Sequence, residues 1–177
     1  MPPLSGPLHI DALRLPQGGV IGMTHCPGRC TTDQRGRPWR RRLDADVDVI
    51  RLAGFTTVLT LLPEEELAAF GVPDLGAQMR HAGLAWRQFP IMDFGVPDLQ
   101  MQLAWPTLQA ELTLQLQAGQ SLLVHCAAGL GRTGTMVALL LKALGRDSAA
   151  AIAAVRAARP GTIETPAQQA FVLNFVA

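Results

Sequence analysis

The sequence predicts an α/β fold with a central, mostly parallel sheet of about five strands flanked by helices. Two observations support this prediction. Apolar, β-branched runs of strand length alternate with longer runs of helical length along most of the chain. The 177 residues, of which 49% are hydrophobic and 16% charged, are enough for one domain with a substantial core. We therefore expect a single domain over residues 1–177.

The first part of the chain is predicted to begin the sheet. Residues 8–15 and 18–24 are short apolar runs separated by Pro-Gln-Gly-Gly, which is typical of two strands joined by a turn. Residues 31–42 are polar and rich in arginine, and we expect them to form a loop. Residues 44–54 begin with acidic side chains and end at a glycine, which predicts a helix.

The middle of the chain continues the alternation. Residues 55–62 are apolar and β-branched, which predicts a buried strand. Residues 63–71 place Pro63 in the first turn of a helix, followed by glutamates that the positive amino end of a helix favours. Another helix is predicted over residues 73–83 and a strand over residues 84–92.

The last part of the chain adds one strand and several helices. Residues 98–118 have a helical pattern, which we expect Pro106 to kink or divide. Residues 121–126 predict a buried strand. Three further helices are predicted over residues 132–145, 148–159 and 165–177. We expect this helical tail to lie on one side of the sheet.

Composition and charge argue against several classes of protein. The formal net charge is +1, so the chain as a whole is not predicted to bind nucleic acid or an anionic membrane surface. The sequence has no apolar run of about 18 residues and no secretory signal pattern. Three cysteines are too few for a disulfide framework. These features favour a cytoplasmic protein, and the single lysine beside many arginines favours a bacterial source.

The stretch HCAAGLGRTG, residues 125–134, joins the last predicted strand to a helix. The strand would bring Cys126 to the carboxyl edge of the sheet, and the glycine-containing turn can curl until several N–H groups point at one centre. The helix that begins near Arg132 adds the positive end of its dipole. The residues predicted to bind phosphate are therefore Ala127, Ala128, Gly129, Leu130, Gly131 and Arg132.

Cys126 and Arg132 supply two chemical functions in that loop. The planar guanidinium of Arg132 can bind two phosphate oxygens at once, which a lysine cannot do. The electrostatic field that binds phosphate also stabilises a thiolate at Cys126, and a thiolate facing phosphorus is a nucleophile. The loop is therefore predicted to attack a phosphate ester.

A serine, threonine or tyrosine oxygen leaves poorly as an anion, so the reaction needs a proton donor. Two aspartates lie in the segment PIMDFGVPD, residues 90–98. Asp93 directly follows a predicted strand, so its carboxylate can reach over the edge of the sheet. Asp98 follows Val-Pro and opens a helix, which is typical of an N-cap. We therefore predict that Asp93 is the acid, with Asp98 as the alternative.

The pattern V-H-C-x-x-G-x-G-R-T-G resembles the signature loop of the cysteine-dependent protein tyrosine and dual-specificity phosphatases. This resemblance implies a protein tyrosine phosphatase-like fold and a reaction without a metal or other cofactor. It makes Cys126 the nucleophile that forms a phosphocysteine and Arg132 the residue that holds the phosphoryl group. It also implies that Thr133 donates its hydroxyl to the sulfur, and that His125 braces the loop through backbone hydrogen bonds.

The segment RPGTIETPAQQAFV, residues 159–172, resembles the C-terminal loop of the same family, where glutamines position the hydrolytic water. Gln168 matches the second of these glutamines. Glu164 stands where the family more commonly has the first glutamine, which departs from the pattern. Gln168 and Gln169 are equally typical of the exposed first turn of a helix.

Four stretches narrow the resemblance to the kinase-associated phosphatase family, and the similarity runs from about residue 14 to the C-terminus. They are GVIGMTHCPGR, LPEEELAAFGVPDL, FPIMDFGVPD and GLGR. The resemblance implies a phosphorylated protein or peptide as substrate, with hydrolysis of phosphotyrosine and also of phosphoserine or phosphothreonine. One alternative is a phosphatase of phosphoinositides or other small phosphomonoesters, although the loop lacks the lysines frequent in lipid-directed relatives. The other is a pseudophosphatase that only binds phosphate.

An arginine cluster in the predicted loop allows two interpretations. Its members are Arg35, Arg37, Arg40, Arg41 and Arg42. We expect them to be solvated, with contact to a phosphorylated partner as the alternative. Trp39, within the cluster, is expected either to fold the loop onto the core or to anchor a partner.

The stretch HCPGRC, residues 25–30, resembles the first half of the catalytic pattern but is predicted to be a turn. Only two residues separate Cys26 from Arg29, and the intervening proline lacks an N–H, so this arc cannot surround a phosphate. A zinc site would need a second pair of ligands, which the sequence does not supply. A redox role would require a thiol of this stretch, Cys26 or Cys30, to lie beside Cys126.

Overall fold

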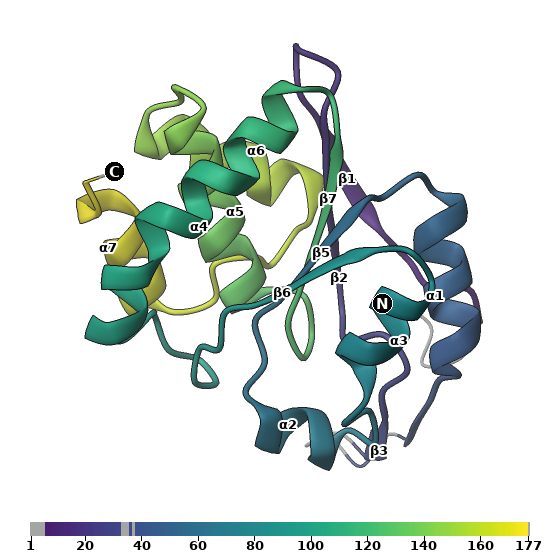
Figure 1. Cartoon of the computed structure of the whole chain (residues 1–177). Helices are drawn as coiled ribbons and strands as arrows, with labels where there is room; N and C mark the ends of the chain where they lie inside the picture. The colour runs from purple at the N-terminus through teal and green to yellow at the C-terminus, as the bar shows by residue number, and fades with distance from the viewer. Residues whose placement is uncertain (1–5, 33–35, 37, 177) are drawn as a thin grey trace.

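The computed structural model describes residues 6–32, 36 and 38–176 of the chain. The strands of its main sheet are β1 (Asp11–Arg14), β2 (Val20–Thr24), β5 (Thr57–Thr60), β6 (Ala85–Gln88) and β7 (Ser121–His125). They lie in the order β1-β2-β7-β5-β6 (Figure 1). β1 pairs antiparallel with β2, and the other three pairings are parallel. The predicted α/β class with a mostly parallel sheet is confirmed.

Helices cover both faces of this sheet. Their bounds are α1 (Leu43–Leu52), α2 (Glu64–Ala69), α3 (Leu75–His81), α4 (Leu99–Gln117), α5 (Gly131–Ala143), α6 (Ser148–Ala158) and α7 (Pro166–Asn174). Figure 1 shows α4 to α7 together on one side of the strands and α1 and α3 on the other. The helical tail therefore packs on one side of the sheet, as the sequence predicted.

The central strand β7 is almost entirely buried, because it lies between β2 and β5 with helices on both faces. Its register places His125 opposite both Thr24 and Thr60. Three parallel strands therefore end at the same level, and the residues that follow them meet at one edge of the sheet. This edge holds the segment after His125.

Helix α4 runs without division through Pro106. Of the two predicted effects of the proline, division of the helix is wrong and a kink stays a prediction. The buried face of α4, which includes Trp105, Leu112 and Leu116, holds both halves against the core. The helix begins after Asp98, whose Oδ1 accepts a hydrogen bond from the backbone N–H of Met101 at 2.8 Å. Asp98 is therefore an N-cap.

Part of the arginine-rich segment forms a hairpin, so the prediction of a loop over residues 31–42 is wrong there. β3 (Cys30–Thr32) pairs antiparallel with β4 (Pro38–Arg40), while Arg35 and Arg37 lie outside the described residues. Arg40 and Arg42 are exposed, as expected of solvated side chains. Arg41 is buried instead.

The buried Arg41 fastens the hairpin to α1. Its guanidinium donates to both carboxylate oxygens of Asp46, at 2.8 and 2.6 Å, and Asp46 also accepts from the N–H of Gly28. A buried charge is tolerated when it is paired and hydrogen-bonded in this way. Trp39 is buried beside His25, so it folds the hairpin onto the core.

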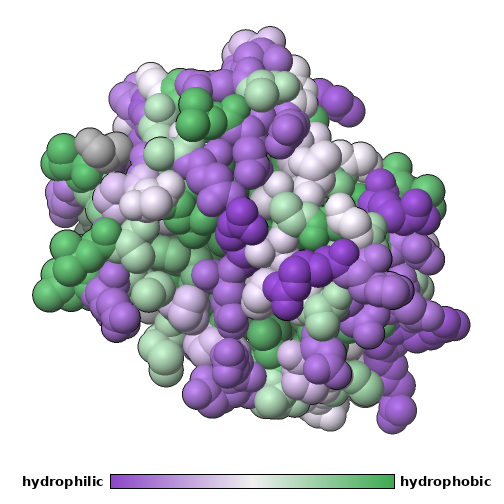
Figure 2. All heavy atoms as spheres, viewed as in Figure 1, coloured by the Kyte–Doolittle hydropathy of each residue, from purple (hydrophilic) through white to green (hydrophobic). Residues whose placement is uncertain are grey.

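Exposed hydrophobic side chains gather on three adjoining segments. They are Met92 and Phe94 after β6, Leu99 and Leu103 at the start of α4, and Leu173 and Val176 at the end of α7. Figure 2 shows hydrophobic surface on the side where α4 and α7 lie. A groove lined by residues of the same segments, among them Val96, Gln102 and Phe171, runs between them. We call Met92, Phe94, Leu99 and Leu103 the apolar rim.

Candidate active site

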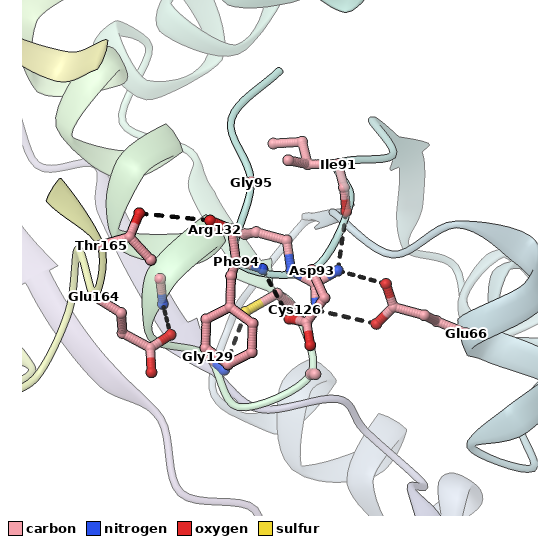
Figure 3. A network of polar contacts seen from close by, with 12 residues as sticks. Glu66, Ile91, Asp93, Phe94, Gly95, Cys126, Gly129, Arg132, Glu164 and Thr165 are labelled. Carbon is pink, nitrogen blue, oxygen red and sulfur yellow. Dashed lines mark hydrogen bonds and ion pairs between the residues drawn. The ribbon is translucent and has the colours of Figure 1, made fainter. Parts of the chain in front are cut away.

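Cys126 follows β7 and is buried at the edge of the sheet, with 3% of its surface exposed. Its Sγ accepts a hydrogen bond from the backbone N–H of Gly129 at 3.2 Å (Figure 3). Gly129 has a φ of +72°, and a Cβ there would collide with the carbonyl oxygen of Thr24. The glycine is required because the loop both turns left-handed and touches the neighbouring strand.

The loop of residues 127–131 then enters helix α5. The helix begins at Gly131, so the N–H of Gly131 belongs to its positive amino end. This N–H donates to Oε2 of Glu164 at 2.8 Å. In the view of Figure 3, Glu164 and Glu66 lie on opposite sides of Cys126. The arrangement is an anion-binding helix terminus with a cysteine at its base.

The guanidinium of Arg132 is buried, and both of its Nη atoms are hydrogen-bonded. Nη1 and Nη2 donate to the two carboxylate oxygens of Glu66 at 2.7 and 3.0 Å. Nη1 also donates to the carbonyl of Ile91 and Nη2 to Oδ1 of Asp93, each at 2.9 Å. Burial alone would lower the pKa of Arg132, but the hydrogen bonds to Glu66 and the nearby negative charges of Cys126, Glu66 and Asp93 together outweigh it and raise that pKa, so the side chain stays charged.

Of the two candidate acids, the structure brings Asp93 to Arg132 and leaves Asp98 as a helix cap. The Asp93 side chain is half exposed, and its Oδ1 also accepts from the N–H of Phe94 at 3.1 Å. Phe94 has a φ of +55°, which is uncommon for a residue other than glycine. The loop that carries Asp93 is thus held over the cysteine by a side-chain ion pair and a constrained backbone.

His125 is buried under the loop and hydrogen-bonded to the neighbouring strand. Its Nε2 lies 2.7 Å from Oγ1 of Thr60, which accepts a hydrogen bond from Nε1 of Trp86. This ring nitrogen therefore contacts a side-chain hydroxyl. The bracing of the loop by His125 through backbone hydrogen bonds stays a prediction. Burial lowers the pKa of His125 to about 4, so the ring is neutral near pH 7.

Thr133 lies in the first turn of α5 and is fully buried. Its Oγ1 makes no hydrogen bond with any residue that the structure describes. The predicted donation from this hydroxyl to the sulfur of Cys126 is therefore not formed in this structure.

Gln168 is a buried connection between α7 and the loop that carries Asp93. Its Oε1 accepts from the N–H groups of Glu164 and Thr165 at 2.9 and 3.2 Å, and its Nε2 donates to the carbonyl of Gly95 at 3.1 Å. It is therefore not an exposed helix residue. Gln169 fits that description, because it is exposed and accepts from Arg156.

The sequence interpretation missed two residues that shape this site, Glu66 and Arg159. Arg159 is buried and donates to the carbonyls of Gly129 and Ala128 at 2.6 and 3.0 Å, while its other nitrogen pairs with Asp11 at 2.6 Å. Holding these carbonyls behind the loop leaves its N–H groups on the opposite side. Glu66 had only a weak indication in the sequence: it lies in the helix that follows β5, and β5 ends beside β7.

The HCPGRC stretch lies against the first loop residue. The N–H of Cys26 and Nη1 of Arg29 both donate to the carbonyl of Ala127, at 3.3 Å each. The guanidinium of Arg29 lies between the rings of Trp39 and Phe70, at 4.8 and 4.3 Å from their centroids. The stretch therefore packs against the loop from the side.

The three cysteines, Cys26, Cys30 and Cys126, are free thiols. Burial raises the pKa of the Cys26 thiol, while Cys30 is exposed on the hairpin. In the described part of the chain, no three histidine, cysteine or acidic side chains are grouped as a metal site requires. A redox contact between Cys26 and Cys126 stays the alternative to the predicted turn.

Comparisons with known proteins agree with this geometry. Residues 39–172 match the family model described as "PTP-SAK: Swiss Army Knife protein, DSP-PTPase phosphatase domain". The chain is 28% identical over 138 residues to human cyclin-dependent kinase inhibitor 3, covering 76% of this chain and 61% of that protein. It is 34% identical over 138 residues to protein tyrosine phosphatase domain-containing protein 1 of Danio rerio, covering 73% of this chain and 19% of that protein.

A solved structure shows the same arrangement over nearly the whole chain. It is the crystal structure of kinase associated phosphatase with its catalytic-site cysteine replaced by serine, at 26% identity and a TM-score of 0.81. The superposition covers 95% of this chain and 93% of that one. The relatives named here do not support the expected bacterial source. Among the described residues, no helix is long and apolar enough to span a membrane.

Proposed function

The chain belongs to the family of DSP-PTPase phosphatase domains, and we propose that it is a cysteine-dependent phosphoprotein phosphatase acting as one catalytic domain over residues 1–177. The predicted relationship to kinase-associated phosphatase is confirmed. The substrate is a phosphorylated protein or peptide carrying phosphotyrosine, with phosphoserine and phosphothreonine as further substrates. A cytoplasmic location and the absence of a nucleic-acid partner remain parts of this proposal.

In the first step, the Cys126 thiolate attacks phosphorus, the bond to the substrate oxygen breaks, and Asp93 gives its proton to that oxygen. The N–H groups of residues 127–131 and the Arg132 fork bind the three equatorial oxygens. Support for these roles comes from the N–H of Gly129 on the sulfur and from the contact between Arg132 and Asp93. Asp93 must leave Arg132 when phosphate arrives, because both anions use the same nitrogen.

In the second step, Asp93 accepts a proton from water, the water oxygen attacks phosphorus, and Cys126 leaves as a thiolate. Thr133 is proposed to donate its hydroxyl to that thiolate, since Oγ1 is buried and has no hydrogen-bond partner among the described residues. His125 is proposed to position the loop through Thr60. Gln168 holds the loop of Asp93 in place through Gly95.

The observation that carries this proposal is the sulfur of Cys126 at the amino end of α5, beside a buried arginine. Cys126→Ser is expected to abolish turnover of para-nitrophenyl phosphate while tungstate, a phosphate analogue, still binds. Turnover by wild-type protein is expected to persist in EDTA, since the mechanism uses no metal. Retained turnover in Cys126→Ser would contradict the assignment of the nucleophile.

A panel of phosphopeptides, phosphoinositides and nucleotides tests the substrate class. Glu66, Asp93 and Glu164 surround the cradle with carboxylates, which disfavours substrates carrying several phosphates. We expect phosphopeptides to give the highest kcat/KM. A higher value for a phosphoinositide would favour the small-phosphoester alternative, and binding of the panel without turnover would favour a pseudophosphatase.

A further inference from the structure

Glu164 occupies part of the site where substrate phosphate is expected to bind. Its Oε2 accepts the N–H of Gly131 at 2.8 Å, and this N–H is the first of helix α5. The amino end of a helix binds one anion or another with the same donors. A phosphate oxygen that takes this N–H must therefore displace the carboxylate.

The chain is built to hold the carboxylate there. Ile163, immediately before Glu164, has a φ of +57° and is 3% exposed. The left-handed region is strained for a β-branched residue, and such strain persists only where the surrounding structure imposes it. The backbone of Glu164 is also fixed, because its N–H donates to Oε1 of Gln168 at 2.9 Å.

The position of the donor, Gly131, is equally specific. A Cβ at Gly131 would lie 2.6 Å from Oε2 of Glu164 and 2.8 Å from the amide atoms of Gln168. Only glycine lets the carboxylate come this close to the helix terminus. The contact is thus fitted from both segments, which are separated by more than thirty residues of sequence.

We propose that Glu164 is an internal anion that competes with substrate phosphate for the Gly131 N–H, and that it thereby selects against free phosphate and small phosphomonoesters. This inference rests on the proposed function. A small ester contacts the cradle only through its phosphate group. It must displace Glu164 from the Gly131 N–H before the phosphate can use every donor of the cradle. A phosphoprotein gains further contacts outside the cradle.

The apolar rim is the surface that can supply those further contacts. Met92, Leu99 and Leu103 are each more than 70% exposed, and Phe94 is 52% exposed, next to Asp93. Burying such side chains against a polypeptide contributes favourable free energy that a small ester cannot obtain. The same competition favours release of the product, because the carboxylate returns to the N–H as inorganic phosphate leaves.

The test compares Glu164→Gln and Glu164→Ala with wild-type protein, using inorganic phosphate as the probe. Calorimetry measures its Kd directly, and inhibition of para-nitrophenyl phosphate turnover measures its Ki. Because a charge-assisted hydrogen bond is lost, both variants are expected to bind phosphate about tenfold more tightly. Glu65→Gln is the matched control, since Glu65 is an exposed glutamate of α2, and it should leave both constants within about twofold.

Selectivity is the second readout. In Glu164→Gln, kcat/KM for para-nitrophenyl phosphate should rise more than kcat/KM for a phosphopeptide with apolar flanking residues. An unchanged or weaker phosphate affinity in both Glu164 variants, with wild-type melting temperatures, would overturn the inference. A loss of kcat with unchanged Ki would also overturn it, because Glu164 would then act on the hydrolytic water. The calorimetry needs no turnover, so a failure of the proposed function is recognised separately.

Discussion

The chain contains two His-Cys pairs at the ends of adjacent parallel strands, one after β2 and one after β7. The register pairs Thr24 with His125, so the two segments leave the sheet side by side. After Cys126 the backbone N–H of Gly129 turns back to the sulfur and a helix begins at Gly131. After Cys26 the next residue is a proline, and the N–H of Gly28 donates away to Asp46.

The arginines of the two segments differ in the same way. Arg132 presents its fork to carboxylates, which are anions that a phosphate can replace. Arg29 is held between two aromatic rings and donates to the carbonyl of Ala127, in the segment after β7. The comparison shows that an anion site needs convergent N–H donors and an arginine with exchangeable partners, whereas a His-Cys pair alone is insufficient.

The largest expected effect is a difference in kcat/KM between variants of Arg132 and of Arg29. Arg132→Lys is expected to lower kcat/KM by about 10²–10³-fold, because an ammonium cannot form the two parallel hydrogen bonds. Arg29→Lys should change kcat/KM by less than about tenfold, since its contacts are with rings and a carbonyl. Steady-state kinetics with para-nitrophenyl phosphate measures both. Comparable losses in the two variants would mean that the segment after β2, which carries Arg29, takes part in phosphate binding.

The next effect concerns the proposed acid Asp93, which contacts the segment after β7 through Arg132. Asp93→Asn is expected to lower kcat for a phosphoserine peptide by about 10²-fold or more, and less for para-nitrophenyl phosphate, whose leaving group needs little protonation. Asp98→Asn keeps a capping oxygen and should leave kcat and the free energy of unfolding nearly unchanged. If Asp98→Asn instead shows the leaving-group dependence, the acid is assigned to the wrong aspartate.

Glycines at φ of about +70° occur in both segments, and their replacement should separate function from stability. A Cβ at Gly28 would lie 2.6 Å from Cβ of Leu43, and one at Gly129 would collide with the backbone of Thr24. Each change to alanine is expected to lower the free energy of unfolding by about 1–3 kcal/mol, measured by urea denaturation. Only Gly129→Ala should also lower kcat at a temperature where both variants are folded.

The most gradual effect is a dependence of the free energy of unfolding on pH. Burial lowers the pKa of His125 from 6.5 to about 4 and, with nearby arginines, that of His25 to about 3. Below pH 6.5 the unfolded chain binds protons that the folded protein does not. The free energy of unfolding therefore falls as the pH drops from about 6.5 to 4, by up to about 1.4 kcal/mol per pH unit for each histidine.

Variants of the two histidines test this dependence and extend the comparison. His25→Gln and His125→Gln should each make the fall shallower in urea titrations between pH 6.5 and 4.5. A slope unchanged from that of the wild-type protein would contradict the buried neutral state. Only His125→Gln should also lower kcat, because Thr60 then loses the partner that positions the loop.

The sequence predicts the fold and the reactive loop because both depend on local pattern. Alternating strand and helix signals give the sheet, and Cys126 to Arg132 form one continuous stretch from the end of β7 into the first turn of α5. Glu66 and Arg159 could not be predicted in the same way. Their roles depend on the direction of side chains from α2 and the end of α6, which only tertiary packing determines.

The hairpin after HCPGRC illustrates the second limit of sequence patterns. Most of its residues are polar apart from the buried Trp39, and no alternation of apolar side chains marks its two short strands. Arg41 is buried there because Asp46, five residues later, neutralises it inside the fold. A pattern of charges cannot reveal such a pairing before the helix that carries the aspartate is placed.

The hydrogen bond from Gln168 to Gly95 connects α7 to the segment that carries Asp93. Because of this link, we expect a displacement of that segment to be felt at the exposed residue beside Gln168, which is Gln169. A fluorophore attached at Gln169 is therefore expected to report such a displacement. The carboxyl-terminal helix thus offers a position for a reporter in single-molecule recordings of the turnover cycle.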